Sequence, residues 1–194
     1  MIDDTQLKIM NATIELIKEK GYSATTTKDI ANLAKVNECT IFRKFKSKKE
    51  IVLCALDQKE WTPSISKDTF EPCIWELEAD LKMFASRYLE KVTSDVVKLS
   101  IGLRAPQIYD DTAPKIMQIP EVFKKSLQQY FEKMYEKNKI AEANFECLAT
   151  MFLSLNFGFA FLKASFENKL IEVEKHEYIE KSIDVFINGI QKTW

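Results

Sequence analysis

The chain has 194 residues, which is enough for one sizeable hydrophobic core or two smaller ones. Because it has only 4 glycines and 5 prolines, its composition favours a mostly helical protein with few turns. Its 4 cysteines are far apart and form no Cys-x-x-Cys pair, which indicates a reducing, cytoplasmic compartment. The N-terminus is acidic and no apolar run approaches about 18 residues, so we expect neither a signal peptide nor a membrane span.

The net charge of −1 says little about nucleic acid, but the charge is unevenly distributed. Residues 21–50 hold seven cations and three anions, a net charge of +4, whereas residues 51–194 carry a net charge of −4. A basic patch on an acidic body is the distribution that a DNA-contacting module requires.

Residues 4–20 form the first predicted helix. Their apolar side chains recur at three- and four-residue spacing. Asp3 or Asp4 is the expected N-cap, and Gly21 is expected to end the helix in the left-handed conformation. Thr26 then begins a second helix of about two turns, and Asp29 completes a capping box with it.

Two more capped starts follow closely. Asn37 is the expected N-cap of a helix over residues 38–45, and Ser47 predicts a further capping box that begins a helix continuing to about Trp61. Two short helices joined by a tight turn, with cations just beyond them, predict a helix-turn-helix that presents its second helix to DNA.

One motif runs through these helices and covers about residues 7–56. It consists of Gly21-Tyr22, Ala24-Thr25-Thr26, Asp29-Ile30-Ala31, Val36, Thr40-Ile41-Phe42 and Phe45-x-Ser47-Lys48. The stretch resembles the DNA-binding domain of TetR/AcrR-family transcriptional regulators, from whose pattern Lys35, Cys39 and Phe42 depart. The resemblance implies an all-α homodimer of about nine helices, with a DNA-binding domain over residues 1–47 and an effector-binding and dimerisation domain over residues 48–194.

The predicted DNA contacts follow from helix geometry. We expect phosphate contacts at the N-termini of the second and fourth helices and base contacts along the third. Arg43 is the best candidate for a guanine contact, while Phe42 can pack against sugar or a thymine methyl group. Glu38 either reads a cytosine amino group or faces away. The predicted phosphate contacts are Thr26, Thr27, Lys28 and Lys48, and the predicted base readers are Asn37, Glu38, Cys39, Thr40, Arg43 and Lys44.

After a predicted loop at residues 62–72, five further helices are expected. They run from Pro72 to about residue 93, over 94–103, from 112–114 to 138, over 143–168 and over 174–192. Pro120 predicts a kink or a split start in the third of these helices.

The stretch 143–168 is apolar on almost every side, so one face is expected to meet its own subunit and the other a second copy. Together with the last helix, whose Ile187-Asn188-Gly189-Ile190 also resembles the family, it predicts a four-helix, two-fold dimer interface. The predicted interface residues are Ser154, Gly158, Phe161, Ser165, Ile183, Phe186, Ile187 and Ile190.

Aromatic side chains are numerous in the C-terminal body, where each belongs either to the core or to a ligand cavity. Asn156 stands out because a polar amide in an apolar helix needs a partner, which can be another side chain, the dimer mate or a ligand. The candidate ligand-binding residues are Trp75, Phe84, Tyr88, Tyr109, Phe123, Phe152 and Asn156.

Nothing in the sequence favours an enzyme. It contains no nucleophile elbow, phosphate loop, dinucleotide glycine pattern or zinc spacing, and its single histidine, His176, cannot build a metal or catalytic site alone. We expect no cofactor. By resemblance, the expected function is repression from a palindromic operator, relieved by a small apolar or aromatic effector. The alternative is a helical interaction protein that has lost sequence-specific DNA binding, with Lys35, Glu38 and Phe42 as its signs.

Overall fold

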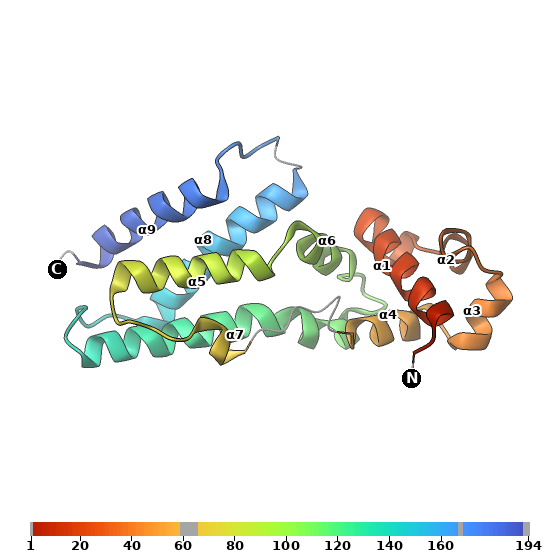
Figure 1. Cartoon of the computed structure of the whole chain (residues 1–194), viewed down its shortest axis with the longest axis horizontal. Helices are drawn as coiled ribbons and strands as arrows, with labels where there is room; N and C mark the ends of the chain where they lie inside the picture. The colour runs from red at the N-terminus through yellow and green to blue at the C-terminus, as the bar shows by residue number, and fades with distance from the viewer. Residues whose placement is uncertain (1, 59–65, 167–168, 192–194) are drawn as a thin grey trace. The chain divides into compact units, whose positions relative to one another are not determined.

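The computed structural model describes residues 2–58, 66–166 and 169–191. These residues form nine α-helices, one short 3-10 helix and no strand, in agreement with the all-α prediction (Figure 1). The helices are α1 (Asp4–Ala24), α2 (Thr27–Ala34), α3 (Glu38–Lys44), α4 (Lys48–Leu56), η1 (Lys67–Phe70), α5 (Leu77–Lys91), α6 (Ser94–Gly102), α7 (Tyr109–Glu136), α8 (Phe145–Ser165) and α9 (Lys175–Gln191).

The described residues form two compact units. The first contains residues 2–58 and 95–117, and the second contains residues 66–94 and 118–191, so that α7 contributes to both. The first unit therefore holds α6 as well as the predicted helix-turn-helix. The functional boundary expected between residues 47 and 48 stays a prediction.

Local capping sets the helix starts of the first unit. The Asp3 side chain accepts a hydrogen bond from the Gln6 amide, and the Gln6 side chain accepts one from the Asp3 amide, which is the reciprocal capping box. Gly21 has a positive φ of 80°, as expected, but its ψ of 164° is extended rather than left-handed helical. The chain therefore kinks at Gly21, and the helical stretch continues to Ala24 instead of ending at Lys20.

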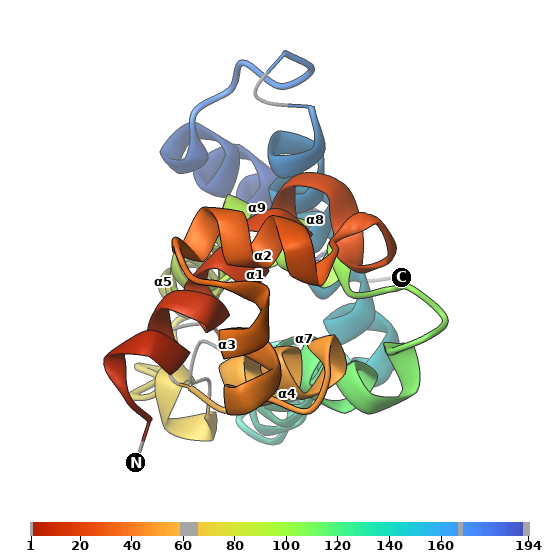
Figure 2. The same cartoon turned by 90° about the vertical axis from the view of Figure 1, so that its right-hand side faces the viewer.

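The core of the first unit joins all of its helices. α1 packs against both α2 and α4, and α2 packs against α3 (Figure 2). Apolar side chains from α6, from the segment that follows it and from the start of α7 complete the same core. Its buried members include Ile9, Ile14, Ile17, Ile30, Ile41, Phe45, Ile51, Val52, Leu99, Leu103 and Ile108.

One predicted helix start in the second unit is wrong. We expected a helix directly after Pro72 with Ile74 on its inward stripe, but α5 begins at Leu77 and Ile74 is 63% exposed. The Ile74 amide donates to a carboxylate oxygen of buried Asp80 at 2.9 Å, and Trp75 adopts a positive φ of 64°. These two features hold the backbone outside the helical conformation.

The remaining helices lie close to the predicted ranges. α7 begins earlier than expected, at Tyr109, and is continuous through Pro120, so the predicted split start is wrong. α4 ends at Leu56, with Asp57 as its C-cap, so the expected continuation to about Trp61 is wrong. The expected end of the last helix at Lys192 lies outside the described residues.

The helix α8 qualifies as a membrane-spanning candidate by length and composition, with 21 residues and a mean hydropathy of 1.6. The sequence prediction had found no such segment. A single helix of this kind is weak evidence, because the core helix of a soluble protein meets the same criterion.

Candidate functional site

Capping and backbone geometry define both ends of α2 and the turn that joins it to α3. The Thr26 hydroxyl accepts the Asp29 amide at 3.1 Å, so the predicted capping box at the start of α2 is present. Lys35 ends α2 with φ 55° and ψ 47°, the left-handed conformation that a non-glycine residue adopts at a cost of about 1–2 kcal/mol. Asn37 occupies the N-cap of α3 but makes no side-chain capping bond.

One side of α3 is buried and the other faces outward. Ile41 and Phe45 are buried in the core of the first unit, as predicted. Phe42 is 57% exposed, and Glu38, Cys39 and Arg43 are exposed as well. An α-helix buries only the stripe that faces its neighbours. Of the other predicted base readers, Asn37 is exposed and Thr40 and Lys44 are half-buried.

Three of the predicted contact residues, Thr27, Glu38 and Lys44, are bonded to other side chains of the protein. The Thr27 hydroxyl donates to a Glu38 carboxylate oxygen at 2.5 Å, which links the starts of α2 and α3. The Lys44 ammonium forms an ion pair with Asp3 at 2.5 Å, and this hydrogen bond is the main reason that the pKa of Asp3 is lowered. Lys44 therefore ties the last turn of α3 to the start of α1.

Lys48 is held by backbone carbonyl groups. Its ammonium donates to the carbonyl oxygens of Tyr22 at 2.7 Å and Thr25 at 2.6 Å, and it lies 4.0 Å from the centroid of the Tyr22 ring. Partial burial lowers the pKa of Lys48. The side chain thus fastens the beginning of α4 to the end of α1 and neutralises exposed carbonyl dipoles there.

The beginning of α2 carries a small charged network. The Lys20 ammonium pairs with Asp29 at 2.8 Å, and the Thr26 hydroxyl donates to the same carboxylate oxygen at 2.7 Å. These bonds lower the pKa of Asp29 to about 2, with the Lys20 hydrogen bond as the largest cause. Asp29 therefore remains ionised beside the predicted phosphate-contact residues Thr26 and Lys28.

The surface around α2 and α3 keeps uncommitted positive charge. Four cations of the basic stretch are exposed and have no ion-pair partner within the described part of the chain: Lys28, Lys35, Arg43 and Lys46. Lys49 pairs with Asp111 at 2.5 Å. The accessible charge therefore lies on α2, on α3 and in the adjoining turns, where it is available to phosphate.

The second unit gathers most of the candidate ligand-binding residues into an aromatic core. Phe84, Tyr88, Phe123 and Phe152 are buried, with ring centroids 4.3 Å apart for Tyr88–Phe123 and 6.1 Å apart for Phe123–Phe152. Tyr109 is 40% exposed and belongs to the first unit, so it does not join this cluster.

Two residues of this core, Phe70 and Asp80, are not among the predicted ligand-binding residues. Phe70 stacks on Phe84, with ring centroids 5.0 Å apart. Asp80 is 2% exposed, and its carboxylate accepts a hydrogen bond from the Tyr130 hydroxyl at 3.0 Å. A cavity of about 40 Å³ adjoins Phe70, Phe84, Trp75 and Tyr130. Phe70 lies in the proline-containing stretch 62–72, which the sequence predicts to be a loop, so helical periodicity could not indicate that its side chain is buried.

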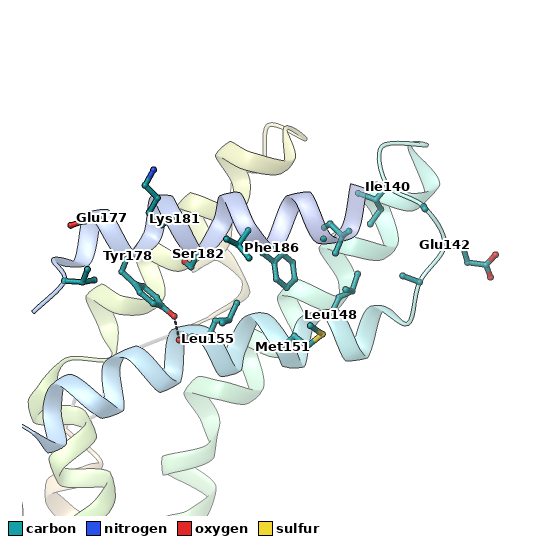
Figure 3. A pocket seen from close by; sticks show the side chains of 16 residues that line it. Ile140, Glu142, Leu148, Met151, Leu155, Glu177, Tyr178, Lys181, Ser182 and Phe186 are labelled. Carbon is teal, nitrogen blue, oxygen red and sulfur yellow. Dashed lines mark hydrogen bonds between the residues drawn. The ribbon is translucent and has the colours of Figure 1, made fainter. Parts of the chain in front are cut away.

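An apolar groove of about 740 Å³ runs between α8 and α9. Figure 3 shows Leu148, Met151 and Leu155 of α8 and Phe186 of α9 pointing into it. The Tyr178 hydroxyl bridges the two helices by donating to the Leu155 carbonyl oxygen at 2.7 Å.

The predicted interface residues divide into two sets. Phe161 and Ile190 are partly exposed, Ser154 and Ser165 are exposed, and an added Cβ at Gly158 would meet no atom within 4 Å. Ile183, Phe186 and Ile187 are instead buried within the protomer. The large apolar side chain most exposed along this face is Val185, at 74%, which is not among the predicted interface residues.

Within the described ranges, no group of three or more His, Cys, Asp or Glu side chains is arranged to hold a metal ion.

Known proteins are similar to this chain in sequence. Residues 9–54 match the family described as bacterial regulatory proteins, tetR family. The HTH-type transcriptional regulator YvkB of Bacillus subtilis is 32% identical over 188 residues, which is 96% of this chain and 97% of YvkB. IcaR of Staphylococcus aureus, a negative regulator of the biofilm operon icaADBC, is 27% identical over 87% of this chain and 88% of its own.

Solved structures show the same fold. FadR of Bacillus subtilis, in complex with stearoyl-CoA, has a TM-score of 0.67 at 18% identity and covers 95% of this chain and 98% of its own. NalD of Pseudomonas aeruginosa, a repressor of a multidrug efflux pump, has a TM-score of 0.70 at 16% identity and covers 98% of both chains. The matched helix-turn-helix and the full-length likeness to YvkB together show that the chain belongs to the TetR family of bacterial transcriptional regulators, which are not enzymes.

Proposed function

We propose that the chain is a dimeric cytoplasmic repressor that binds a palindromic operator through α3 and is released by a small apolar or aromatic effector. The observation that carries the proposal is the outer face of α3, where Arg43 and Phe42 are exposed beside the capped start of α2. Two such helices, related by a two-fold axis, enter successive major grooves about 34–36 Å apart.

The DNA-binding part is tested by a mobility shift on the DNA upstream of the chain's own gene, at several salt concentrations. Arg43→Gln is expected to weaken binding by about 5- to 150-fold, because a bidentate guanine contact contributes about 1–3 kcal/mol. The matched control is Arg104→Gln, which removes the same charge from an exposed position after α6. Equal affinities of the two variants would favour a helical interaction protein without sequence-specific DNA binding.

The groove between α8 and α9 supports the proposal that the chain forms a dimer. Met151, Leu155 and Val185 are exposed apolar side chains that line it, and such a contiguous patch is typical of an interface. A second copy related by two-fold symmetry buries the same patch on both subunits. Val185→Glu is expected to give monomers in sedimentation experiments. Ile74→Glu, at an apolar position outside the groove that is 63% exposed against 74% for Val185, leaves the dimer intact.

The effector part is supported by the aromatic core of the second unit, which is larger than dimerisation alone requires. FadR, a protein of the same fold, was solved in complex with stearoyl-CoA, whose stearoyl chain is apolar. An effector lowers operator affinity only by its differential affinity for the released conformation. A panel of apolar and cationic compounds is screened for operator release, and the absence of release across the panel would refute this part.

A further inference from the structure

The helix α8 contains a buried polar side chain with an unused hydrogen-bonding atom. Asn156 is 3% exposed and lies on the inward stripe between Phe152 and Phe159. Its amide nitrogen donates to the Phe152 carbonyl oxygen at 2.9 Å. Its side-chain oxygen is buried and has no hydrogen-bond partner within the described ranges.

The orientation of this amide is fixed by its own helix. Exchanging the oxygen and nitrogen would place two oxygens against each other at the Phe152 carbonyl and lose the 2.9 Å bond. The unpartnered atom is therefore an acceptor. A buried acceptor without a donor destabilises the folded protein, whereas leucine at this position would fill similar space without that penalty.

The structure removes two of the three partners that Asn156 was expected to have. No side chain of the described chain donates to its oxygen, and its burial within the protomer keeps it from the surface of a second copy. The remaining source of a donor is a bound molecule, either a ligand or an enclosed water.

The surroundings define the chemistry of that molecule. Phe152, one turn before Asn156, lies 6.1 Å from Phe123 and 5.2 Å from Phe186 between ring centroids. Burial raises the pKa of Tyr88, which contacts Phe123, so its phenol stays neutral. These neighbours carry no charge and present aromatic surface, which suits a neutral apolar ligand.

We propose that Asn156 is the specificity residue of the effector site, and that it selects a neutral, apolar or aromatic molecule carrying one N–H or O–H donor for its side-chain oxygen. This inference rests on the proposed effector function and names the chemical class of the effector. The cavity of about 40 Å³ beside Phe84 is not lined by Asn156 and is too small for such a molecule, so binding requires the rings around Asn156 to move.

The test uses indole and indene as probes with the full-length protein. The two molecules have the same bicyclic shape, but only indole has an N–H donor. Binding is measured by calorimetry, and the wild type is expected to bind indole about tenfold more tightly than indene, equivalent to about 1.4 kcal/mol. Asn156→Leu is expected to bind both probes equally and to unfold at a higher temperature than the wild type when no probe is present.

The control is Asn11→Leu, because Asn11 in α1 also has a buried, unpartnered side-chain oxygen but belongs to the first unit. It should leave the indole preference unchanged. Asn156→Ala serves as a second variant if the leucine variant does not fold. Equal binding of both probes to the wild type, no binding of either, or a preference that persists without Asn156 would overturn the inference.

The outcome also separates this inference from the proposed function. If both probes bind equally and both release the operator, the effector function stands and the donor requirement is wrong. If indole shows the expected preference but releases no operator, Asn156 marks a binding site that does not control DNA binding.

Discussion

Gly102, the last residue of α6, permits the closest approach between α6 and α1. A Cβ added there would lie 2.4 Å from the Ile17 carbonyl oxygen and 2.8 Å from Ile17 Cγ2. Ordinary carbon contacts lie at about 3.5–4.0 Å, so Gly102→Ala forces α1 and α6 apart by about 1 Å. Overpacking costs about 1–3 kcal/mol, and the obstacle here is helix backbone, which cannot rotate away.

The expected net loss is about 2 kcal/mol. We take the upper end of the overpacking range and subtract about 1 kcal/mol for the better helix propensity of alanine. For a chain of this length, a loss of about 2 kcal/mol lowers the unfolding midpoint by about 4–8 °C. Circular dichroism of the full chain during heating measures this shift. Adding Ile17→Ala should restore little stability, because the carbonyl oxygen remains in place.

The matched control is Gly189→Ala in α9, where an added Cβ has no heavy atom within 4 Å. Both glycine variants are compared in the Val185→Glu background, which keeps a second copy off the groove. The control should unfold at the same or a higher temperature than its parent. An unchanged midpoint for Gly102→Ala would show that α1 and α6 do not pack as closely as 2.4 Å implies.

Three further predictions concern the DNA-binding unit. Lys48→Gln should weaken operator binding with little change in its salt dependence, because its ammonium is committed to carbonyl groups; a salt slope reduced by about 0.9 would show a phosphate contact instead. Operator DNA should protect Cys39 from alkylation while leaving Cys147, which is also exposed, equally reactive; equal labelling rates at Cys39 with and without DNA would contradict the placement of α3. The pKa of Asp29 is lowered to about 2 in the folded protein, so ionised Asp29 stabilises the folded state above its unfolded pKa of about 3.9. This contribution is lost as the pH falls through about 2. In acid unfolding experiments, the stability difference between the wild type and Asp29→Asn should therefore vanish over that pH window.

The helix starts of the first unit were predictable because their determinants are local. The capping bonds at Asp3, Thr26 and Ser47 each join residues three positions apart, and the positive φ of Lys35 follows from the short turn it occupies. The start of α5 was not predictable in the same way. It depends on a hydrogen bond from Ile74 to a carboxylate that is buried only in the folded protein.

The DNA-contact surface stays a prediction, and the structure changes the chemistry expected of two of its cations. Lys44 and Lys48 looked equivalent to the other cations of the basic stretch. Lys44 pairs with Asp3, 41 residues away, and Lys48 binds carbonyl groups 23 and 26 residues away. No spacing rule within one helix reveals such partners.

The sequence by itself determined the all-α class, the capped helix-turn-helix and the family, because these depend on short-range patterns of caps, apolar periodicity and motif. Only the tertiary structure decided which cations remain accessible, that Ile183 and Phe186 belong to the protomer core, and that the Asn156 oxygen lacks a partner. Burial and pairing between distant residues arise when helices pack, so each depends on contacts that no single stretch of the chain contains.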